Sequence, residues 1–111
     1  MATSQMLKGI IDGCILTIIS RKEVYGYEIA ELLATYGFDS MSEGTIYPIL
    51  LRLQKEELVT SKRKKSTAGP KRKYYYISDK GVKELKEFTL RWESLKINVT
   101  NVLDNRKEQE K

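Results

Sequence analysis

The chain has 111 residues, of which 41% are hydrophobic and 32% are charged, and its formal net charge is +5. This length and composition predict one globular domain with a modest core, and they exclude an intrinsically disordered chain. The chain has no His and a single Cys, so we expect no zinc finger, no histidine-based acid–base catalysis, no disulfide framework and no cofactor.

The first predicted element is an apolar helix over residues 4–20. Its apolar side chains recur with the spacing of one helix face, and Leu16 lies beside this stripe and widens it. The stripe contains Leu7, Ile10, Ile11, Cys14, Ile15, Ile18 and Ile19. A helix this apolar should be buried on most sides, and Cys14 within it is interpreted as a small buried hydrophobic residue. Asp12 interrupts the run, which is also too short to span a bilayer, so an export signal is disfavoured and we expect a cytoplasmic protein.

Two more helices are predicted, over Tyr25–Tyr36 and over the stretch Ser42–Val59, where the helix should end near Glu57. Gly37 is the expected stop signal of the earlier one. The later helix has an apolar stripe on one side, and its other side offers hydroxyls, a phenol and cations. The stripe contains Ile46, Ile49, Leu50 and Leu53. Three short helices with a tight link between the last two predict a helix-turn-helix.

Either of two residues can cap the third helix. With Thr45 as the N-cap, Pro48 lies in the first turn, where its missing N–H costs nothing. With Ser42 as the N-cap, Pro48 lies in the second turn and should bend the helix. We expect the start at Ser42, with a loose first turn. The residues expected near bases or the flanking phosphates are Ser42, Thr45, Tyr47 and Arg52.

A β-hairpin, or wing, is predicted from two segments of strand composition, Val59–Lys64 and Lys73–Ile77, with a turn at Ser66–Pro70. Residues 58–78 carry seven Lys or Arg and no acid, whereas residues 1–57 carry five Lys or Arg and eight Asp or Glu. This segment is either a solvated basic loop or a polyanion-binding element, and the clustering favours the second. The candidates for phosphate contact are Lys62, Lys64, Lys65, Lys71, Arg72 and Lys73. Most of the tyrosines in the second strand should pack the wing on the core, with Tyr75 on the opposite face from Tyr74 and Tyr76.

A long helix is predicted from the N-cap Ser78 to about Asn105, followed by a charged tail, Arg106–Lys111, that should fray. Its apolar residues alternate spacings of three and four, which is a heptad-like seam: Leu85, Phe88, Trp92, Leu95, Val99 and Val102. This ridge must be buried, so we expect a homodimer built by the last helix and the first. The dimer contacts are assigned to Leu85, Leu95, Val99 and Val102.

These elements predict a mainly helical α+β fold in two parts. Residues 1–78 should form a winged helix-turn-helix DNA-binding domain, and residues 79–111 a C-terminal dimerisation helix. No paired nucleophile and base and no phosphate-cradling glycine motif is present, so we expect a protein that is not an enzyme. The alternative function is a winged-helix protein-interaction module without specific DNA binding, because a fold does not fix function. The concentrated charge of the wing argues against that alternative.

Four strings of this sequence, in their order and spacing, resemble the PadR family of bacterial transcriptional regulators. They are Leu7-Lys8-Gly9-Ile10-Ile11-Asp12, Tyr25-Gly26-Tyr27-Glu28-Ile29, Ser42-Glu43-Gly44-Thr45-Ile46-Tyr47-Pro48-Ile49-Leu50-Leu51-Arg52-Leu53 and Gly69-Pro70-Lys71-Arg72-Lys73-Tyr74-Tyr75-Tyr76-Ile77-Ser78. The short C-terminal part is similar to that of the small subfamily with a single C-terminal helix. The resemblance implies a dimeric repressor that binds a palindromic operator in double-stranded DNA and releases it on sensing a compound or stress.

The resemblance also implies a role for Trp92. In small multidrug-sensing members of the family, a Trp on the last helix faces the dimer mate and stacks on flat aromatic drugs, and Trp92 stands at the corresponding distance from Ser78. We therefore expect Trp92, Phe88 and Leu16 as effector contacts and a planar aromatic small molecule as a ligand. The alternative, in which Trp92 only fills the seam, stays open. Some relatives hold cationic drugs with an acid one turn later, whereas this chain has Lys96 there, which argues against a cationic ligand.

Overall fold

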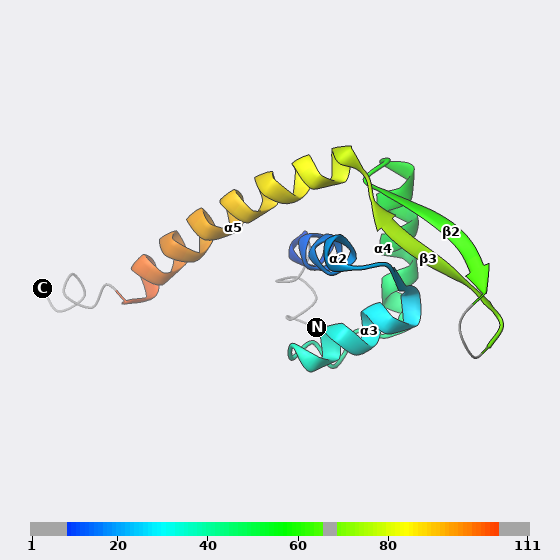
Figure 1. Cartoon of the computed structure of the whole chain (residues 1–111). Helices are drawn as coiled ribbons and strands as arrows, with labels where there is room; N and C mark the ends of the chain where they lie inside the picture. The colour runs from blue at the N-terminus through cyan, green and yellow to red at the C-terminus, as the bar shows by residue number, and fades with distance from the viewer. Residues whose placement is uncertain (1–8, 66–68, 105–111) are drawn as a thin grey trace, which may run out of the picture.

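The computed structural model describes residues 9–65 and 69–104, and Figure 1 shows helices packed against one small antiparallel sheet. The elements in chain order are α2 (Ile10–Arg21), β1 (Val24–Tyr25), α3 (Gly26–Thr35), α4 (Glu43–Lys55), β2 (Val59–Lys65), β3 (Lys71–Ile77) and α5 (Asp79–Asp104). The predicted α+β class with a winged helix-turn-helix is confirmed. Residues 4–8 of the predicted first helix, Ser66–Ala68 of the predicted turn and the tail Arg106–Lys111 lie outside the described residues. Within the described ranges, no helix has the length and apolar character needed to cross a membrane.

The core lies between the three N-terminal helices and the base of the sheet. The apolar stripe predicted for the first helix is buried there, together with residues of α3, α4 and the strands. The buried apolar residues are Ile11, Ile15, Leu16, Ile18, Ile19, Val24, Ile29, Leu33, Ile46, Leu50, Leu53, Leu58, Val59 and Tyr75. Each fully buried Leu or Ile stabilises the fold by roughly 1.5–3 kcal/mol, so this cluster holds the helix-turn-helix together and fixes which face of α4 remains outside.

The short strand β1 corrects the predicted start of the second helix. Tyr25, expected as the first helical residue, is extended (φ −105°, ψ 165°) and pairs with Tyr74, while Val24 pairs with Tyr75. The Tyr25 N–H donates to Glu28 Oε1 at 3.2 Å, so the glutamate caps the start of α3. The sheet order is therefore β1-β3-β2, and the hairpin is anchored to the helices by a third strand.

The helix α4 begins after Ser42, which was the expected start, and it contains Pro48. The Ser42 carbonyl accepts from the Thr45 N–H at 3.0 Å and from the Ile46 N–H at 3.1 Å, so the first turn mixes 3₁₀ and α hydrogen bonds. At the other end, Glu57 has a positive φ of 65°, which turns the chain out of the helix and into β2. The residues of this first turn, from Ser42 to Thr45, are exposed.

The helix α5 is tied to the domain at its beginning and projects away from it afterwards (Figure 1). The Gly81 N–H donates to Ser78 Oγ at 3.0 Å, which confirms Ser78 as the cap. A Cβ on Gly81 of α5 would overlap the Leu58 carbonyl, and a Cβ on Gly13 of α2 would overlap the Phe88 ring of α5. The first part of α5 therefore packs closely on the rest of the domain at these two glycines. Beyond Phe88, every described residue of α5 is exposed.

Candidate nucleic-acid interface

The N-terminal turn of α4 presents three of the predicted base-reading residues to solvent. Ser42, Thr45 and Tyr47 are exposed, and Ser42 Oγ lies 3.4 Å from Thr45 Oγ1. The Tyr47 ring covers Gly26 at the start of α3, because a Cβ there would lie 2.9 Å from the ring. The side chain of Tyr47 is still 45% exposed, so it has both a packing contact and a free edge.

Arg52, the fourth predicted residue of this helix, is held by a carboxylate of another helix. Its Nη2 lies 2.8 Å from Asp12 Oδ1 and 2.6 Å from Asp12 Oδ2. The hydrogen bond that Arg52 donates to the Asp12 carboxylate raises the pKa of the Arg52 guanidinium. The contact of Arg52 with DNA stays a prediction, and its structural partner Asp12 was not expected from the sequence.

The wing has two faces, which its register defines. The strands β2 and β3 pair from Val59↔Ile77 to Lys65↔Lys71 without a break, and directly paired residues share a face while successive residues alternate. We call the face that carries Val59, Tyr75 and Ile77, and packs on the helices, the inner face, and the other the outer face. The inner face carries Arg63, Lys65, Lys71 and Lys73. The outer face carries Lys62, Lys64 and Arg72.

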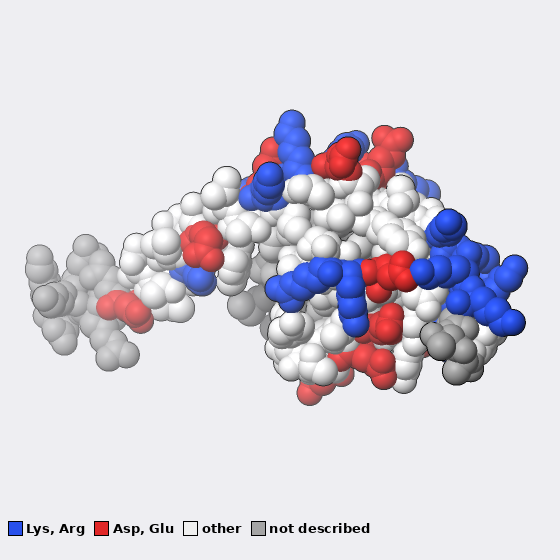
Figure 2. Space-filling view, in the orientation of Figure 1, with Lys and Arg blue, Asp and Glu red and all other residues white. Residues whose placement is uncertain are grey.

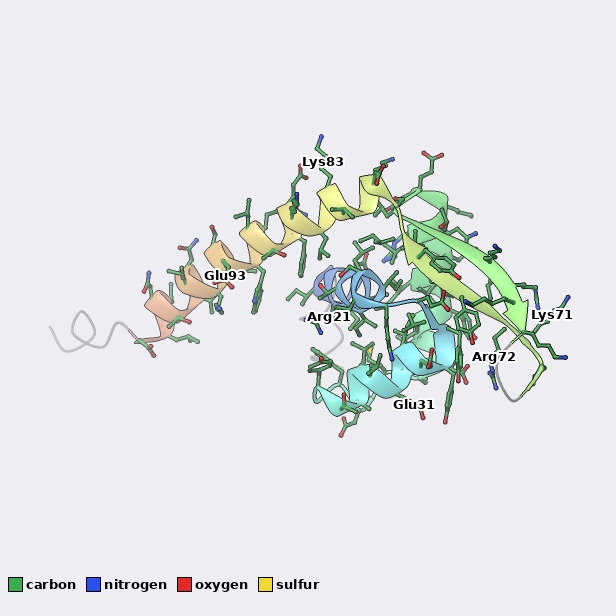
Figure 3. All side chains as sticks on the ribbon, in the orientation of Figure 1. Arg21, Glu31, Lys71, Arg72, Lys83 and Glu93 are labelled. Carbon is green, nitrogen blue, oxygen red and sulfur yellow. The ribbon has the colours of Figure 1, made fainter. Side chains whose placement is uncertain are left out.

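Six of these cations lie opposite one another in three like-charged pairs: Arg63↔Lys73, Lys64↔Arg72 and Lys65↔Lys71. Like charges directly opposite across two strands destabilise the pairing, so the free end of the hairpin favours a bound polyanion. Figure 2 shows Lys and Arg gathered over this end of the molecule. In Figure 3, Lys71 extends from the tip of the hairpin, and Arg72 lies nearer the start of α3.

Two outer-face cations, Lys64 and Arg72, contact aromatic rings, and Lys64 also contacts a carboxylate. The Arg72 guanidinium lies 4.6 Å from the centre of the Tyr25 ring, and Lys64 Nζ lies 5.0 Å from that of Tyr74. These two rings meet edge to face, with centroids 5.5 Å apart. Each outer-face cation of the middle pair is thus held by a side chain of the sheet.

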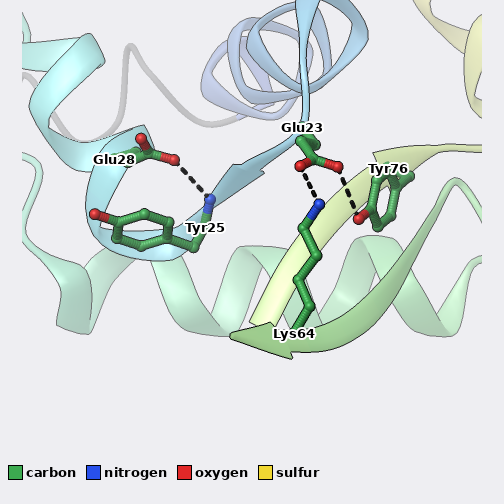
Figure 4. Close-up of polar contacts among 5 residues, drawn as sticks. All are labelled: Glu23, Tyr25, Glu28, Lys64 and Tyr76. Atoms are coloured by element: carbon green, nitrogen blue, oxygen red, sulfur yellow. Dashed lines mark hydrogen bonds and ion pairs between the residues drawn. The ribbon is translucent and has the colours of Figure 1, made fainter. Parts of the chain in front are cut away.

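Glu23, the residue before β1, contacts Lys64 and Tyr76 of the wing (Figure 4). Its Oε1 accepts from Lys64 Nζ, and its Oε2 accepts from the Tyr76 hydroxyl at 3.0 Å. The hydrogen bond from Lys64 lowers the pKa of the Glu23 carboxyl, and the carboxylate raises the pKa of Lys64. The predicted phosphate contact Lys64 therefore already has an anionic partner within the chain.

The inner face of the wing and the exposed start of α4 belong to elements that pack together. The strand β2 contacts α4, and Gln54 Nε2 donates to Ser61 Oγ at 3.1 Å. All four inner-face cations are exposed. Sequence reasoning missed Arg63, because only the register shows that it opposes Lys73 on this face.

Two of the three predicted effector residues line the same cavity. Leu16 is buried and lines, with the half-buried Phe88, a cavity of about 360 Å³ between α2, α4 and α5. Trp92, 37% exposed, is not among the residues that line it.

Of the predicted dimer contacts, Leu85 packs against the core, whereas Leu95, Val99 and Val102 are exposed.

Cys14 is half-buried in α2, and burial raises the pKa of its thiol. This is the environment expected of a packing residue. In the described part of the chain, no group of His, Cys, Asp and Glu is placed to hold a metal ion.

Comparison with known proteins gives consistent matches over most of the chain. The profile of the transcriptional regulator PadR-like family matches residues 15–87. A solved PadR-like transcriptional regulator from Bacillus cereus strain ATCC 14579 is 54% identical, with a TM-score of 0.84 over 90% of this chain and 97% of that chain. A Streptococcus transcriptional regulator is 37% identical, with a TM-score of 0.84 over 90% and 98% of the two chains. An uncharacterized protein of Lysinibacillus sphaericus is 34% identical over 98 residues, which are 86% of this chain and 90% of that protein.

Proposed function

Because this chain belongs to the PadR-like family of transcriptional regulators, we propose that it is a homodimeric, cytoplasmic repressor that binds a specific operator in double-stranded DNA. The observation that carries this proposal is the pairing of two surfaces: the exposed start of α4 and the cationic inner face of the wing, on elements that contact each other. The family is one of regulators and not of enzymes.

In the proposed complex, α4 enters the major groove by its N-terminal turn. Ser42, Thr45 and Tyr47 then face base edges or the flanking phosphates, since a major groove admits a helix and displays donors and acceptors that differ between base pairs. The exposed inner-face cations of the wing neutralise phosphates beside it, which supplies affinity without reading sequence. The outer-face residues Lys62, Lys64 and Arg72 are candidates for weaker contacts.

The proposed dimer is built by α5. Leu95, Val99 and Val102 are exposed at 49%, 46% and 72%, and a seam of this kind is stabilised when a second helix covers it. Residues 1–78 are then the DNA-binding domain and residues 79–111 the dimerisation helix. A dimer whose recognition helices lie about 34 Å apart reads two half-sites one turn of duplex apart, so a palindromic operator is expected.

The proposed signal is a small molecule or a stress that changes the spacing of the two DNA-binding domains. Trp92 lies within the exposed seam, and Phe88 and Leu16 lie at the nearby crossing of α5 and α2. Two Trp92 rings from two chains could stack on one planar aromatic ligand. Binding that favours one spacing of the domains would shift the population away from the operator-bound state.

A salt titration of duplex binding tests the proposed function. An operator selected from a randomised duplex library and an unrelated duplex of the same length are titrated at several salt concentrations. A DNA-binding regulator is expected to prefer the selected duplex and to lose affinity steeply as salt rises. The alternative, a protein-interaction module, predicts no selected sequence and no preference.

A further inference from the structure

The two faces of the wing differ in how many of their cations are available. The four inner-face cations are exposed: Arg63, Lys65, Lys71 and Lys73, of which Lys73 lies with its Nζ 5.9 Å from the centre of the Tyr75 ring. On the outer face only Lys62 is exposed, and Lys64 and Arg72 are half-buried against tyrosines. Within the described ranges, Glu23 is the only carboxylate that forms an ion pair with a wing cation. The outer face is therefore partly neutralised, and the inner face is not.

The difference matters because a duplex is attracted to any cationic surface. Phosphate contacts carry no sequence information, so a ribbon with cations on both faces can bind DNA on either side. Only the inner face lies on the side of the sheet that packs on the helices, where β2 contacts α4, so we expect DNA on that face to meet α4 at the same time. Binding on the outer face would add non-specific affinity and nothing to operator recognition.

The Glu23–Lys64 pair is poorly suited to a role in stability. The two side chains are 42% and 40% exposed, and exposed ion pairs contribute little to folding because water and salt screen them. The sheet has other anchors at this point, since Val24 is fully buried and pairs with Tyr75. What the pair does change is the charge that the outer face offers to a phosphate.

We propose that Glu23 is a specificity-determining residue, which occupies Lys64 on the outer face of the wing and thereby directs DNA to the inner face. It acts by making a competing binding mode less favourable, which is a general route to specificity. Tyr25 and Tyr74 assist it by holding the two cations of the middle pair, Arg72 and Lys64, over their rings. This inference rests on the proposed DNA-binding function.

The test compares Glu23→Gln with a matched control, Glu31→Gln. Both variants remove one negative charge, and glutamine at position 23 can still accept from the Tyr76 hydroxyl. Glu31 is exposed on α3 and has no ion pair among the described residues; Figure 3 shows it away from Lys71 and Arg72. Affinities for the library-selected operator and for an unrelated duplex are measured between 50 and 200 mM salt, with thermal unfolding as the check of the fold.

One added phosphate contact steepens the salt slope by about 0.9. Between 200 and 50 mM salt, the affinity of Glu23→Gln for the unrelated duplex should therefore rise by a factor about 3.5 times larger than the factor for the wild type. Glu31→Gln should show no such additional rise. Operator affinity should rise less, so the ratio of the two affinities falls. Adding Lys64→Gln to Glu23→Gln should return the unrelated duplex to wild-type affinity. Retention on heparin, a polyanion without bases, should rise for Glu23→Gln and fall again for the double variant.

Three results would overturn the inference. An equal ratio in Glu23→Gln and Glu31→Gln, with unchanged thermal unfolding, would leave Glu23 as a surface ion pair only. A large fall in the unfolding temperature of Glu23→Gln would make it a structural residue of the sheet. A gain that persists in the double variant would show that Lys64 is not the cation involved. Failure of the proposed function looks different, since the wild type itself would then show no preference for any selected duplex.

Discussion

Arg52 of α4 and Asp12 of α2 form an ion pair through both carboxylate oxygens, at 2.8 and 2.6 Å from Arg52 Nη2. The pair joins the proposed recognition helix to the first helix of the described structure, which also contacts α5. It therefore links α4 to the helix that also packs on α5, so it lies between the proposed recognition helix and the proposed dimerisation helix.

Breaking this pair should destabilise the fold modestly. The side chains of Arg52 and Asp12 are 43% and 27% exposed, so we expect a coupling of about 0.5–1 kcal/mol between Asp12→Ala and Arg52→Ala. Denaturant unfolding of the wild type, both single variants and the double variant gives this coupling directly. Additive single effects would show that the contact contributes nothing to stability.

The inner-face residue Lys71 should contribute phosphate affinity without specificity. We expect Lys71→Ala to weaken binding to every duplex similarly and to flatten the salt slope by about 0.9, because one neutralised phosphate is lost. Lys64→Ala is the matched outer-face variant and should change the slope less, since Glu23 already pairs with Lys64. Fluorescence anisotropy at several salt concentrations measures both. Loss of affinity for the operator alone would assign Lys71 to base reading instead.

Tyr47 should carry sequence preference. We expect Tyr47→Ala to leave the fold intact and to reduce the gap between operator and non-specific affinity, because the side chain is 45% exposed at the start of α4. Tyr47→Phe keeps the ring over Gly26 and removes only the hydroxyl, so it separates a hydrogen bond to DNA from packing. Circular dichroism checks the fold of both variants. Unfolded Tyr47→Ala would mean that its contact with Gly26 is part of the core.

Leu95 should be buried between two chains. Replacing a buried Leu by Ala typically costs roughly 2–5 kcal/mol, so Leu95→Ala should shift the protein from dimer towards monomer. Analytical ultracentrifugation over a range of concentrations measures the shift. Lys83→Ala, at an exposed position of α5 (Figure 3), is the control and should leave the assembly unchanged. The monomer should also lose its preference for palindromic sites, because each chain then reads one half-site.

Trp92 should report and bind a planar aromatic ligand. It is the single Trp of the chain, so quenching of the intrinsic fluorescence by a panel of flat aromatic compounds assigns the contact without labelling. Trp92→Ala is expected to keep the dimer and lose the ligand, and an active compound should weaken operator binding by the wild type. A monomeric Trp92→Ala, or a wild type indifferent to the panel, would leave Trp92 as a residue that fills the seam.

The sequence alone determined which segments are helical, where α4 and α5 begin and the charge of the wing. Apolar periodicity placed Ile46, Leu50 and Leu53 in the core, and the capping residues Ser42 and Ser78 lie where their helices begin. These features depend on neighbours within one or two turns of chain, so local spacing predicts them. The cluster of seven cations is likewise a property of adjacent residues.

Only the tertiary structure decided which of those side chains are available. Arg52 and Asp12 are 40 residues apart in the sequence, and Lys64 and Glu23 are 41 residues apart. Neither contact can be predicted from the local spacing of residues. The strand β1 is two residues long and exists because β3 offers it a partner at Tyr74 and Tyr75. The division of the wing cations into an exposed inner set and an outer set with two half-buried members follows from strand register and from the third strand, β1. Pairing over long distances is set by packing and not by the residues next along the chain.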